Sequence, residues 1–384
     1  MIKLLIDGVF YQLNNTGIAR LWTILLQNLA SSNKFDIYLL NRGNLPTIKG
    51  IKYINFIQYD INKPELDSLM IQKVCDELDI DLFSSTYYTT PTKTPTLLII
   101  YDMIPEVFKF DMTNTMWIEK GNAISYAQKY ICISENTKKD LLNYYPEIPS
   151  DRVDTCYCGV EEDIFFQHQD NEINKFIAKH SLKRNYFILV GNRGDINNYK
   201  NCYIFFKSIS TIINFNADIL CVGGNINLEN YIIENLPYNS KCIRLDLNDY
   251  ELSIAYSGAL ALIYPSLYEG FGLPVIESMA SGCPVITTHK GSLLEVASDS
   301  AYIISGNCVL EMQKAVINIQ NYKLRCLLKA KGFDHIKKFS WHEFSNCVSH
   351  NLLKLYEESN LGIYTVFFDL WNKSRLKSAK NKTY

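Results

Sequence analysis

The chain has 384 residues, of which 47% are hydrophobic and 20% charged, and its formal net charge at pH 7 is −2. This length suits two domains of about 150–200 residues each, with enough apolar residues for a sizeable core. The near-neutral charge argues against nucleic acid as a partner, because phosphate binding usually requires an excess of basic residues. No apolar run reaches the roughly 18–20 residues that span a bilayer.

The eleven cysteines are scattered along the chain without any CxxC pair. The first apolar run becomes polar at Asp7, which is too early for a secretory signal and typical of a first β-strand. We therefore expect reduced thiols, most of them filling the core of a cytoplasmic protein. The six histidines show no metal-ligand spacing, so no metal site is expected.

Short apolar runs alternate with helical patterns along the chain, which predicts two doubly wound parallel sheets. Expected strands of the first half are residues 2–6, 35–40, 82–84, 96–101 and 129–133; expected helices are 18–30, 67–78 and 134–142. The polar stretch 167–172 is interpreted as the interdomain linker. Expected strands of the second half are 186–190, 217–222, 242–245, 259–264, 285–287 and 301–304. Such an α/β protein of two Rossmann-like domains would bind ligands in the cleft at the carboxyl ends of its strands.

The most informative stretch runs from Tyr264 to Glu277 and follows an expected strand. Its glycines, Gly270 and Gly272, allow a ligand to approach the main chain closely, and Pro274 is well placed in the first turn of a helix that begins near Leu273. A helix N-terminus favours an anion such as a diphosphate. Glu269 and Glu277, eight positions apart across this turn, can accept hydrogen bonds from sugar hydroxyls.

This stretch resembles the E-x7-E signature of the retaining glycosyltransferases of family 4, which have the GT-B fold. The likeness extends to Pro265-Ser266 before the motif and to residues 280–286 after it. It implies that Glu269 contacts the transferred sugar and that Glu277 contacts the nucleotide ribose. It also implies that main-chain amides of Gly270, Phe271, Gly272 and Leu273 contact sugar or phosphate oxygens.

Residues 186–190 with Gly191, Arg193 and Lys200 resemble the strand and basic loop that open the family's donor domain. The resemblance implies that Arg193 and Lys200 neutralise the departing diphosphate, which would make a metal unnecessary. An insertion at residues 194–199 alters the spacing of the two cations, so Lys200 is the stronger candidate. Each could otherwise be an ordinary surface cation.

In the first half, residues 15–20 resemble the family's opening loop, which implies that the Gly17 backbone faces the donor phosphate. Residues 99–105 resemble its H-D-x-x-P segment, but Tyr101 stands where histidine is usual. Asp102 remains an acceptor-side candidate with a catalytic role, or it only caps a turn. The resemblance covers roughly residues 1–357.

The last segment has aromatic residues at 364–371, followed by Lys373, Arg375, Lys377, Lys380 and Lys382. An aromatic band beside cations can bind an anionic membrane face. Alternatively, a last helix crosses back to the first domain, as in GT-B enzymes, and buries the aromatic rings. The expected organisation is an acceptor-side domain at 1–165, a donor domain at 166–350, and a crossing helix with a basic tail at 351–384.

The resemblance favours a retaining, metal-independent hexosyltransferase of the mannosyltransferase-like group, acting in surface polysaccharide or lipopolysaccharide biosynthesis. Its donor would be a nucleotide diphosphate sugar, with GDP-mannose first and a UDP-sugar as the alternative, and it would need no other cofactor. Its acceptor would be a glycan or a lipid-linked glycan at the inner face of the plasma membrane. The competing interpretations are a nucleotide-sugar epimerase of the same fold and a non-catalytic nucleotide-sugar-binding scaffold.

Overall fold

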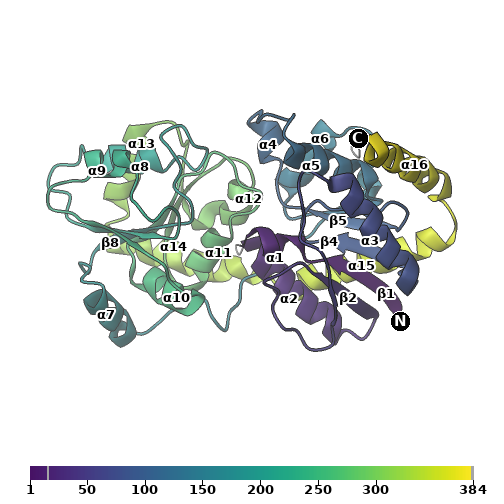
Figure 1. Cartoon of the computed structure of the whole chain (residues 1–384). Helices are drawn as coiled ribbons and strands as arrows, with labels where there is room; N and C mark the ends of the chain where they lie inside the picture. Colours follow the sequence, from purple (N-terminus) through teal and green to yellow (C-terminus); the bar gives the residue numbers. More distant parts are fainter. Residues whose placement is uncertain (15–16, 382–384) are drawn as a thin grey trace. The chain divides into compact units, whose positions relative to one another are not determined.

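The computed structural model describes residues 1–14 and 17–381, with side chains described up to residue 374. The chain divides into two compact units, residues 1–158 with 341–384, and residues 159–340 (Figure 1). These divisions lie earlier than the expected boundaries at 165/166 and 350/351. The polar stretch 167–172 is not the linker, because it belongs to the second unit and leads into the helix α7 (Asp170–Lys179).

The first unit is a seven-stranded parallel sheet covered by helices. Its strands are β1 (Ile2–Asp7), β2 (Phe35–Asn41), β3 (Lys52–Asn55), β4 (Leu82–Ser85), β5 (Thr96–Ile100), β6 (Lys129–Cys132) and β7 (Val153–Thr155). Its helices are α1 (Val9–Leu13), α2 (Gly17–Ser31), α3 (Pro64–Leu78), α4 (Ile104–Val107), α5 (Thr115–Tyr126), α6 (Glu135–Tyr144), α15 (Trp341–Asn360) and α16 (Thr365–Asn381), with a 3₁₀ turn at Ser150–Arg152.

The second unit is a six-stranded parallel sheet of the same kind. Its strands are β8 (Tyr186–Val190), β9 (Asp218–Val222), β10 (Cys242–Leu245), β11 (Ala261–Tyr264), β12 (Val285–Thr288) and β13 (Tyr302–Ile304). Besides α7, its helices are α8 (Cys202–Ile209), α9 (Asn230–Asn235), α10 (Asp249–Gly258), α11 (Leu273–Ala280), α12 (Leu293–Ala297), α13 (Val309–Asn318) and α14 (Tyr322–His335), with 3₁₀ turns at Ser298–Ser300 and Ile336–Lys338.

Each sheet has one place where the strand order reverses. The orders are β3-β2-β1-β4-β5-β6-β7 and β10-β9-β8-β11-β12-β13, so the reversals lie between β1 and β4 and between β8 and β11. All pairs are parallel; Leu4 of β1, for example, lies between Ile37 and Leu82. Open α/β sheets bind ligands outside the carboxyl ends of the strands at this reversal. Each unit therefore offers one such position, and the expected fold class of two Rossmann-like domains is confirmed.

The C-terminal segment returns to the first unit, as the crossing-helix alternative expected. Helix α15 packs on α2, β5 and β6, and α16 packs on α3. The ring centres of Phe367, Phe368 and Trp371 lie 5.4–6.0 Å from that of the buried Tyr126, so these rings pack against the core, with Phe368 buried and the other two partly buried. The expected cations from Arg375 onward lie outside the described side chains.

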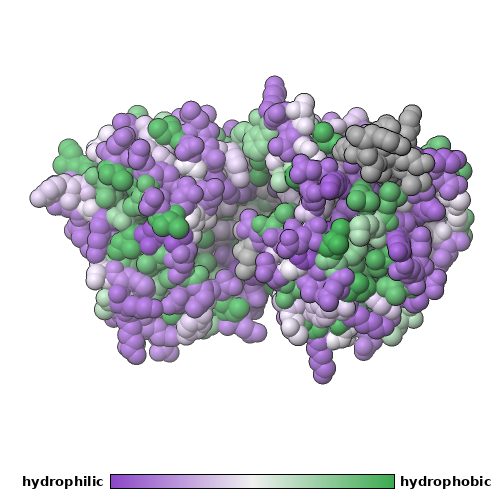
Figure 2. Space-filling model, viewed as in Figure 1, coloured by the Kyte–Doolittle hydropathy of each residue, from purple (hydrophilic) through white to green (hydrophobic). Residues whose placement is uncertain are grey.

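Hydrophilic side chains cover most of the molecular face in Figure 2, with smaller apolar patches between them. Among the residues that the structure describes, no helix is long and apolar enough to cross a bilayer.

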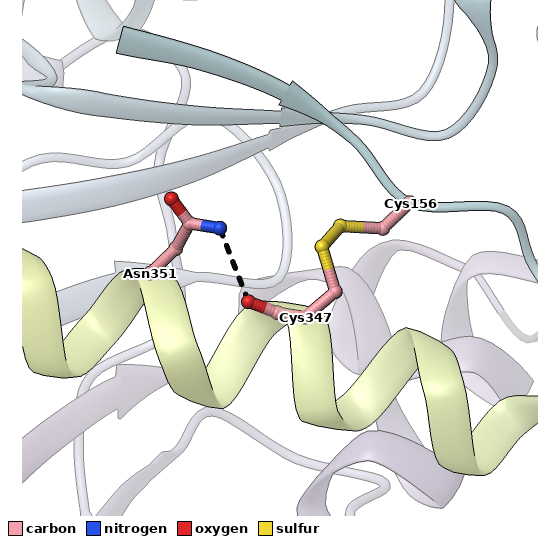
Figure 3. Close-up of a disulfide and its surroundings, with 3 residues drawn as sticks. All are labelled: Cys156, Cys347 and Asn351. Atoms are coloured by element: carbon pink, nitrogen blue, oxygen red, sulfur yellow. Dashed lines mark hydrogen bonds between the residues drawn. A yellow bond between two sulfur atoms is a disulfide. The ribbon is translucent and has the colours of Figure 1, made fainter. Parts of the chain in front are cut away.

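A disulfide joins the two parts of the first unit. Cys156, just after β7, is bonded to Cys347 of α15, 191 positions later (Figure 3). The expectation of reduced thiols is therefore wrong for this pair, which no local spacing could reveal. The other nine cysteines are free, and six of them are buried, as expected for small core residues. In the second unit, the Val160 amide donates a hydrogen bond to the Phe339 carbonyl. The two segments that connect the units are therefore joined to each other by the disulfide in the first unit and by this hydrogen bond in the second.

Candidate functional site

The Gly-rich turn lies at the strand reversal of the second sheet, between the end of β11 and the start of α11. Gly272 has a φ of +102° and precedes the helix, and Pro274 occupies its first turn. Because L-residues rarely adopt this φ, glycine is needed for the chain to enter the helix here. Glu269 and Glu277 are both buried, with 7% and 3% exposure, so neither is a solvated surface charge.

Lys200 and Glu269 form a close ion pair at this turn. The Lys200 Nζ atom lies 2.7 and 3.0 Å from the two carboxylate oxygens of Glu269. The ammonium also lies 5.3 and 5.7 Å from the ring centres of Tyr199 and Tyr264. Burial alone would lower the pKa of Lys200, but the Glu269 carboxylate and the two tyrosines raise it well above its ordinary value. The side chain is therefore held as a cation.

Three hydrogen bonds fix the Lys200 loop, two of them to the chain leaving β11 and one to Gly306, which follows β13. The Leu267 amide donates to the Tyr199 carbonyl at 2.7 Å. The Asn201 side-chain amide donates to the carbonyls of Pro265 and Gly306 at 3.1 and 2.6 Å. Asn201 has a left-handed φ of +54°, which asparagine tolerates better than most residues. The positioning role of Asn201 was not predicted from the sequence.

A second loop supports the turn from the end of β12. The Ser292 hydroxyl is within 2.9 Å of the carbonyls of both Glu269 and Phe271. Gly291 has a φ of +56°, and a Cβ atom there would lie 3.0 Å from the backbone N and O of Glu269. The Phe271 ring packs edge-on against Phe339, so only its main chain is placed to serve a ligand. The contribution of Gly291 and Ser292 was not foreseen, because it depends on two loops meeting.

We expect Gly291→Ala to lower kcat/KM for glycosyl transfer by about tenfold or more, because the methyl group would displace the Glu269 backbone. Gly223→Ala is the matched control: its φ of +72° imposes similar strain, but no atom lies within 4 Å of the added Cβ. Steady-state kinetics on both variants test this, with thermal unfolding to compare their stability. Equal losses in the two variants would show that backbone strain, not the Glu269 contact, is responsible.

Arg193 lies in a different setting from Lys200. It is buried, its Nε atom is 2.7 Å from a Glu229 oxygen, and its other nitrogens donate to the carbonyls of Gly223 and Asn225. It thereby ties the loop after β8 to the loop after β9. Those loops line a cavity of about 1180 Å³ that includes residues 195–198 and 224–231. Gly191, at the end of β8, has a φ of +94° and open space beside its Cα. Glu229 was not singled out from sequence.

The remaining candidates belong to the first unit. Gly17 is the first residue of α2, and Asn15 and Thr16 lie outside the described residues. Tyr101 is buried; its hydroxyl donates to the Thr86 carbonyl and accepts from the Trp22 indole at 2.6 Å. Asp102 is half-buried, and its Oδ1 accepts from the Ile104 amide at 2.9 Å. Asp102 therefore caps this turn through Oδ1, and its Oδ2 atom takes no part in this hydrogen bond.

The second unit's site combines a fixed cation, two buried carboxylates and a helix N-terminus at the carboxyl edge of the sheet. Such a set can bind the diphosphate and hydroxyl groups of one ligand. In the described part of the chain, no group of three or more His, Cys, Asp or Glu residues could hold a metal ion.

Residues 170–323 match the family described as "Glycosyl transferases group 1". The chain is 26% identical over 244 residues to the O-antigen chain mannosyltransferase RfbU of Salmonella typhimurium, covering 62% of this chain and 65% of that relative. The chain thus spans slightly less than two thirds of this curated relative.

Solved structures resemble the fold over nearly the whole chain. Sucrose-phosphate synthase from Thermosynechococcus elongatus has a TM-score of 0.73 at 14% identity, covering 93% of this chain and 100% of that one. Anabaena Alr3699/HepE in complex with UDP-glucose has a TM-score of 0.71 at 13% identity, covering 92% and 100%. At such low identity these matches show the architecture alone.

Proposed function

Through residues 170–323 this chain belongs to the glycosyl transferases group 1 family, and on that premise we propose that it is a retaining, metal-independent hexosyltransferase. It transfers mannose from GDP-mannose to a glycan or lipid-linked glycan in surface polysaccharide biosynthesis. The relative in Salmonella, an O-antigen chain mannosyltransferase, supports the choice of sugar and pathway class.

The Lys200–Glu269 pair carries this proposal. Its ammonium and carboxylate lie at the strand reversal of the second sheet, beside the N-terminus of α11. The leaving nucleotide diphosphate gains negative charge in the transition state, and a fixed cation there lowers the barrier. Lys200 has three N–H donors, so it can bind a phosphate oxygen while it keeps a bond to Glu269.

The other residues have binding roles in this proposal. Glu269 accepts hydrogen bonds from hydroxyl groups of the transferred sugar, and Glu277 accepts hydrogen bonds from the ribose hydroxyl groups. Main-chain amides of residues 270–273 and the backbone of Gly191 and Gly17 contact the donor, while Arg193 orders the loops that follow β8 and β9. Asp102 serves the acceptor.

The proposed location is cytoplasmic, at the inner membrane face. Val366 and Leu370, one helical turn apart on α16, are 72% and 63% exposed, which supports peripheral contact with a membrane through this helix.

We expect GDP and GDP-mannose to raise the unfolding temperature of the second unit by about 5–10 °C at a hundredfold excess over the dissociation constant. A ligand that binds only the folded state stabilises it by mass action. Differential scanning fluorimetry against GDP, UDP and their sugar conjugates, without added metal, measures this. EDTA should leave the shift unchanged.

If only UDP compounds raised the unfolding temperature, the donor would be a UDP-sugar and the proposed site would stand. A shift with nucleotides but no sugar transfer to any acceptor would favour a non-catalytic nucleotide-sugar-binding scaffold, and no shift with any nucleotide would contradict the proposal. Release of an altered free sugar without acceptor would indicate an epimerase. The anomeric coupling constant of the product, measured by NMR, tests retention of configuration.

A further inference from the structure

The second unit has a cleft of about 730 Å³ at the edge of its sheet opposite to the Lys200 site. Its lining includes residues 184–185, 258–260, 282 and 284, which precede β8, β11 and β12, so the cleft lies at the amino ends of these strands. The Lys200 site follows the carboxyl ends of β8 and β11, and a strand of the length of β8 spans about 16 Å. The two sites therefore lie at opposite edges of one sheet, and none of the described residues lines both.

One face of helix α14 forms a wall of this cleft. Tyr322, Arg325, Cys326 and Lys329 line it, and their spacing of three and four positions places them on the same side of the helix. Residues 167–170, at the start of α7, also line the cleft. The cleft is therefore built within one unit from two helices and the amino ends of three strands.

The cleft carries more positive than negative charge. Its lining contains the cations Arg184, Arg325 and Lys329 but a single carboxylate, that of Asp170. The chain as a whole has a formal net charge of −2, so this excess of cations is local. Cations gathered in a cleft focus a positive field there, which favours an anionic ligand.

Lys329 has no ion-pair partner in the part of the chain that the structure describes, and its ammonium lies 5.9 Å from the centre of the Phe333 ring. The end of its side chain lies over Gly282, where a Cβ atom would be 2.9 Å from Cε and 3.2 Å from Nζ of Lys329. Burial lowers the pKa of Lys329, although the charge of Asp170 opposes this effect. A half-buried ammonium without a paired carboxylate is stabilised when an anion binds it.

Arg325 is held in place beside Lys329. Its Nη1 atom donates to the carbonyls of Ile319 and Gln320, just after α13, at 3.0 and 2.7 Å. Its Nε and Nη2 atoms take no part in these two bonds, and guanidinium N–H groups match the geometry of phosphate oxygens. Arg184 pairs with Asp170 at 3.0 Å, but their side chains are 55% and 82% exposed, so this pair is weak and can open.

We propose that this cleft binds the phosphate group of a small polar ligand or of a lipid headgroup, at a site separate from the donor site. Arg325 and Lys329 bind the phosphate oxygens. The side-chain amides of Gln167, Gln169 and Asn185 in the lining can donate to other polar groups of the ligand. A cleft of this size accommodates more than a single phosphate. The proposal does not depend on the proposed glycosyl transfer.

Trace labelling with acetic anhydride, followed by peptide mass spectrometry, measures the reactivity of each lysine in the full chain. The reagent acylates the neutral amine, so a bound phosphate slows the reaction at Lys329 by raising its pKa and covering it. We expect glucose 1-phosphate to slow labelling of Lys329 by about tenfold, the effect of one pKa unit, whereas glucose has no effect. Lys323, exposed on the same helix and outside the cleft lining, is the internal control. Labelling of Lys200 reports occupancy of the donor site separately.

Arg325→Gln should raise by about tenfold the concentration of glucose 1-phosphate that halves the labelling rate of Lys329, because it removes a charged hydrogen-bond donor. Arg184→Gln should also raise this concentration, and its exposed position makes an effect on folding small. Lys323→Gln is the matched control on α14 and should leave the concentration unchanged.

Protection of Lys329 by glucose 1-phosphate would assign the site to a free phosphorylated ligand. Protection by vesicles of phosphatidic acid alone, with none by phosphatidylcholine vesicles, would assign it to a lipid headgroup, and either result supports the phosphate site. The proposal is overturned if neither probe protects Lys329, if Lys323 is slowed equally, or if sodium chloride at the same ionic strength has the same effect. Protection of Lys329 in a protein that binds no nucleotide would contradict the proposed function and leave the phosphate site standing.

Discussion

Lys200→Ala is expected to lower kcat/KM for glycosyl transfer by about a thousandfold, the scale found when one fixed group that stabilises transition-state charge is removed. Lys200 is the cation that contacts Glu269 at the Gly-rich turn, with its side chain 22% exposed and its ammonium 2.7 Å from the carboxylate. Its loss removes the charge that would stabilise the leaving diphosphate. It also leaves the carboxylate of the buried Glu269 side chain without this partner.

Initial rates with saturating and limiting donor measure this effect and separate kcat from KM. Lys179→Ala is the matched control, because Lys179 also forms a lysine–glutamate pair in this unit, with Glu251 at 2.9 Å, but its side chain is 63% exposed. We expect that variant to keep its activity, since exposed pairs contribute little. If Lys200→Ala remained folded and transferred sugar at the original rate, Lys200 would have no role in the chemistry.

Much of the fold could be predicted because buried parallel strands leave a local signal. The runs at β8 and β10 were expected with the bounds the structure gives them, and β1 extends one residue further, to Asp7. The edge strand β3, with two exposed residues at its start, has no apolar run and was missed. The three-residue strand β7 was missed because it is too short to show a pattern. The sequence signal was therefore lost where a strand is exposed or very short, whereas the partly buried edge strand β10 was still recognised.

The candidate site shows the same division between local and tertiary information. The Gly-rich turn is continuous in the chain, so its residues and their motif could be recognised. The Lys200–Glu269 contact joins residues 69 positions apart, and the Arg193–Glu229 contact joins residues 36 apart. Lys200 and Glu269 were both expected at the donor site through resemblance to a family, but neither contact was predicted, because ion pairing across loops depends on the packing of strands. In the first unit, the ion pairs of Arg42 with Asp7 and Asp67 join residues 35 and 25 positions apart and have no local signature for the same reason.

Reduction of the Cys156–Cys347 disulfide is expected to destabilise the first unit by up to about 5 kcal/mol, on the chain-entropy estimate for a loop of this length. The 191-position separation makes the loop long, so an unfolded chain without the bond gains much freedom. For a unit of this size the unfolding temperature would fall by about 10–20 °C. The decrease would be smaller if the second unit stayed folded, because the closed loop would then be shorter. Calorimetry with and without reductant measures this.

The double variant Cys156→Ala/Cys347→Ala is the control, because reductant should no longer change its unfolding temperature. The nine other cysteines are free, so reductant has no second target within the chain. Peptide mapping after alkylation, performed without reductant on oxidised protein, should show these two residues protected as one linked pair. If both are alkylated under those conditions, or if the oxidised and reduced proteins unfold at the same temperature, the bond does not stabilise the attachment of α15 to the first unit. That attachment would then depend on the packing of α15 against α2, β5 and β6 alone.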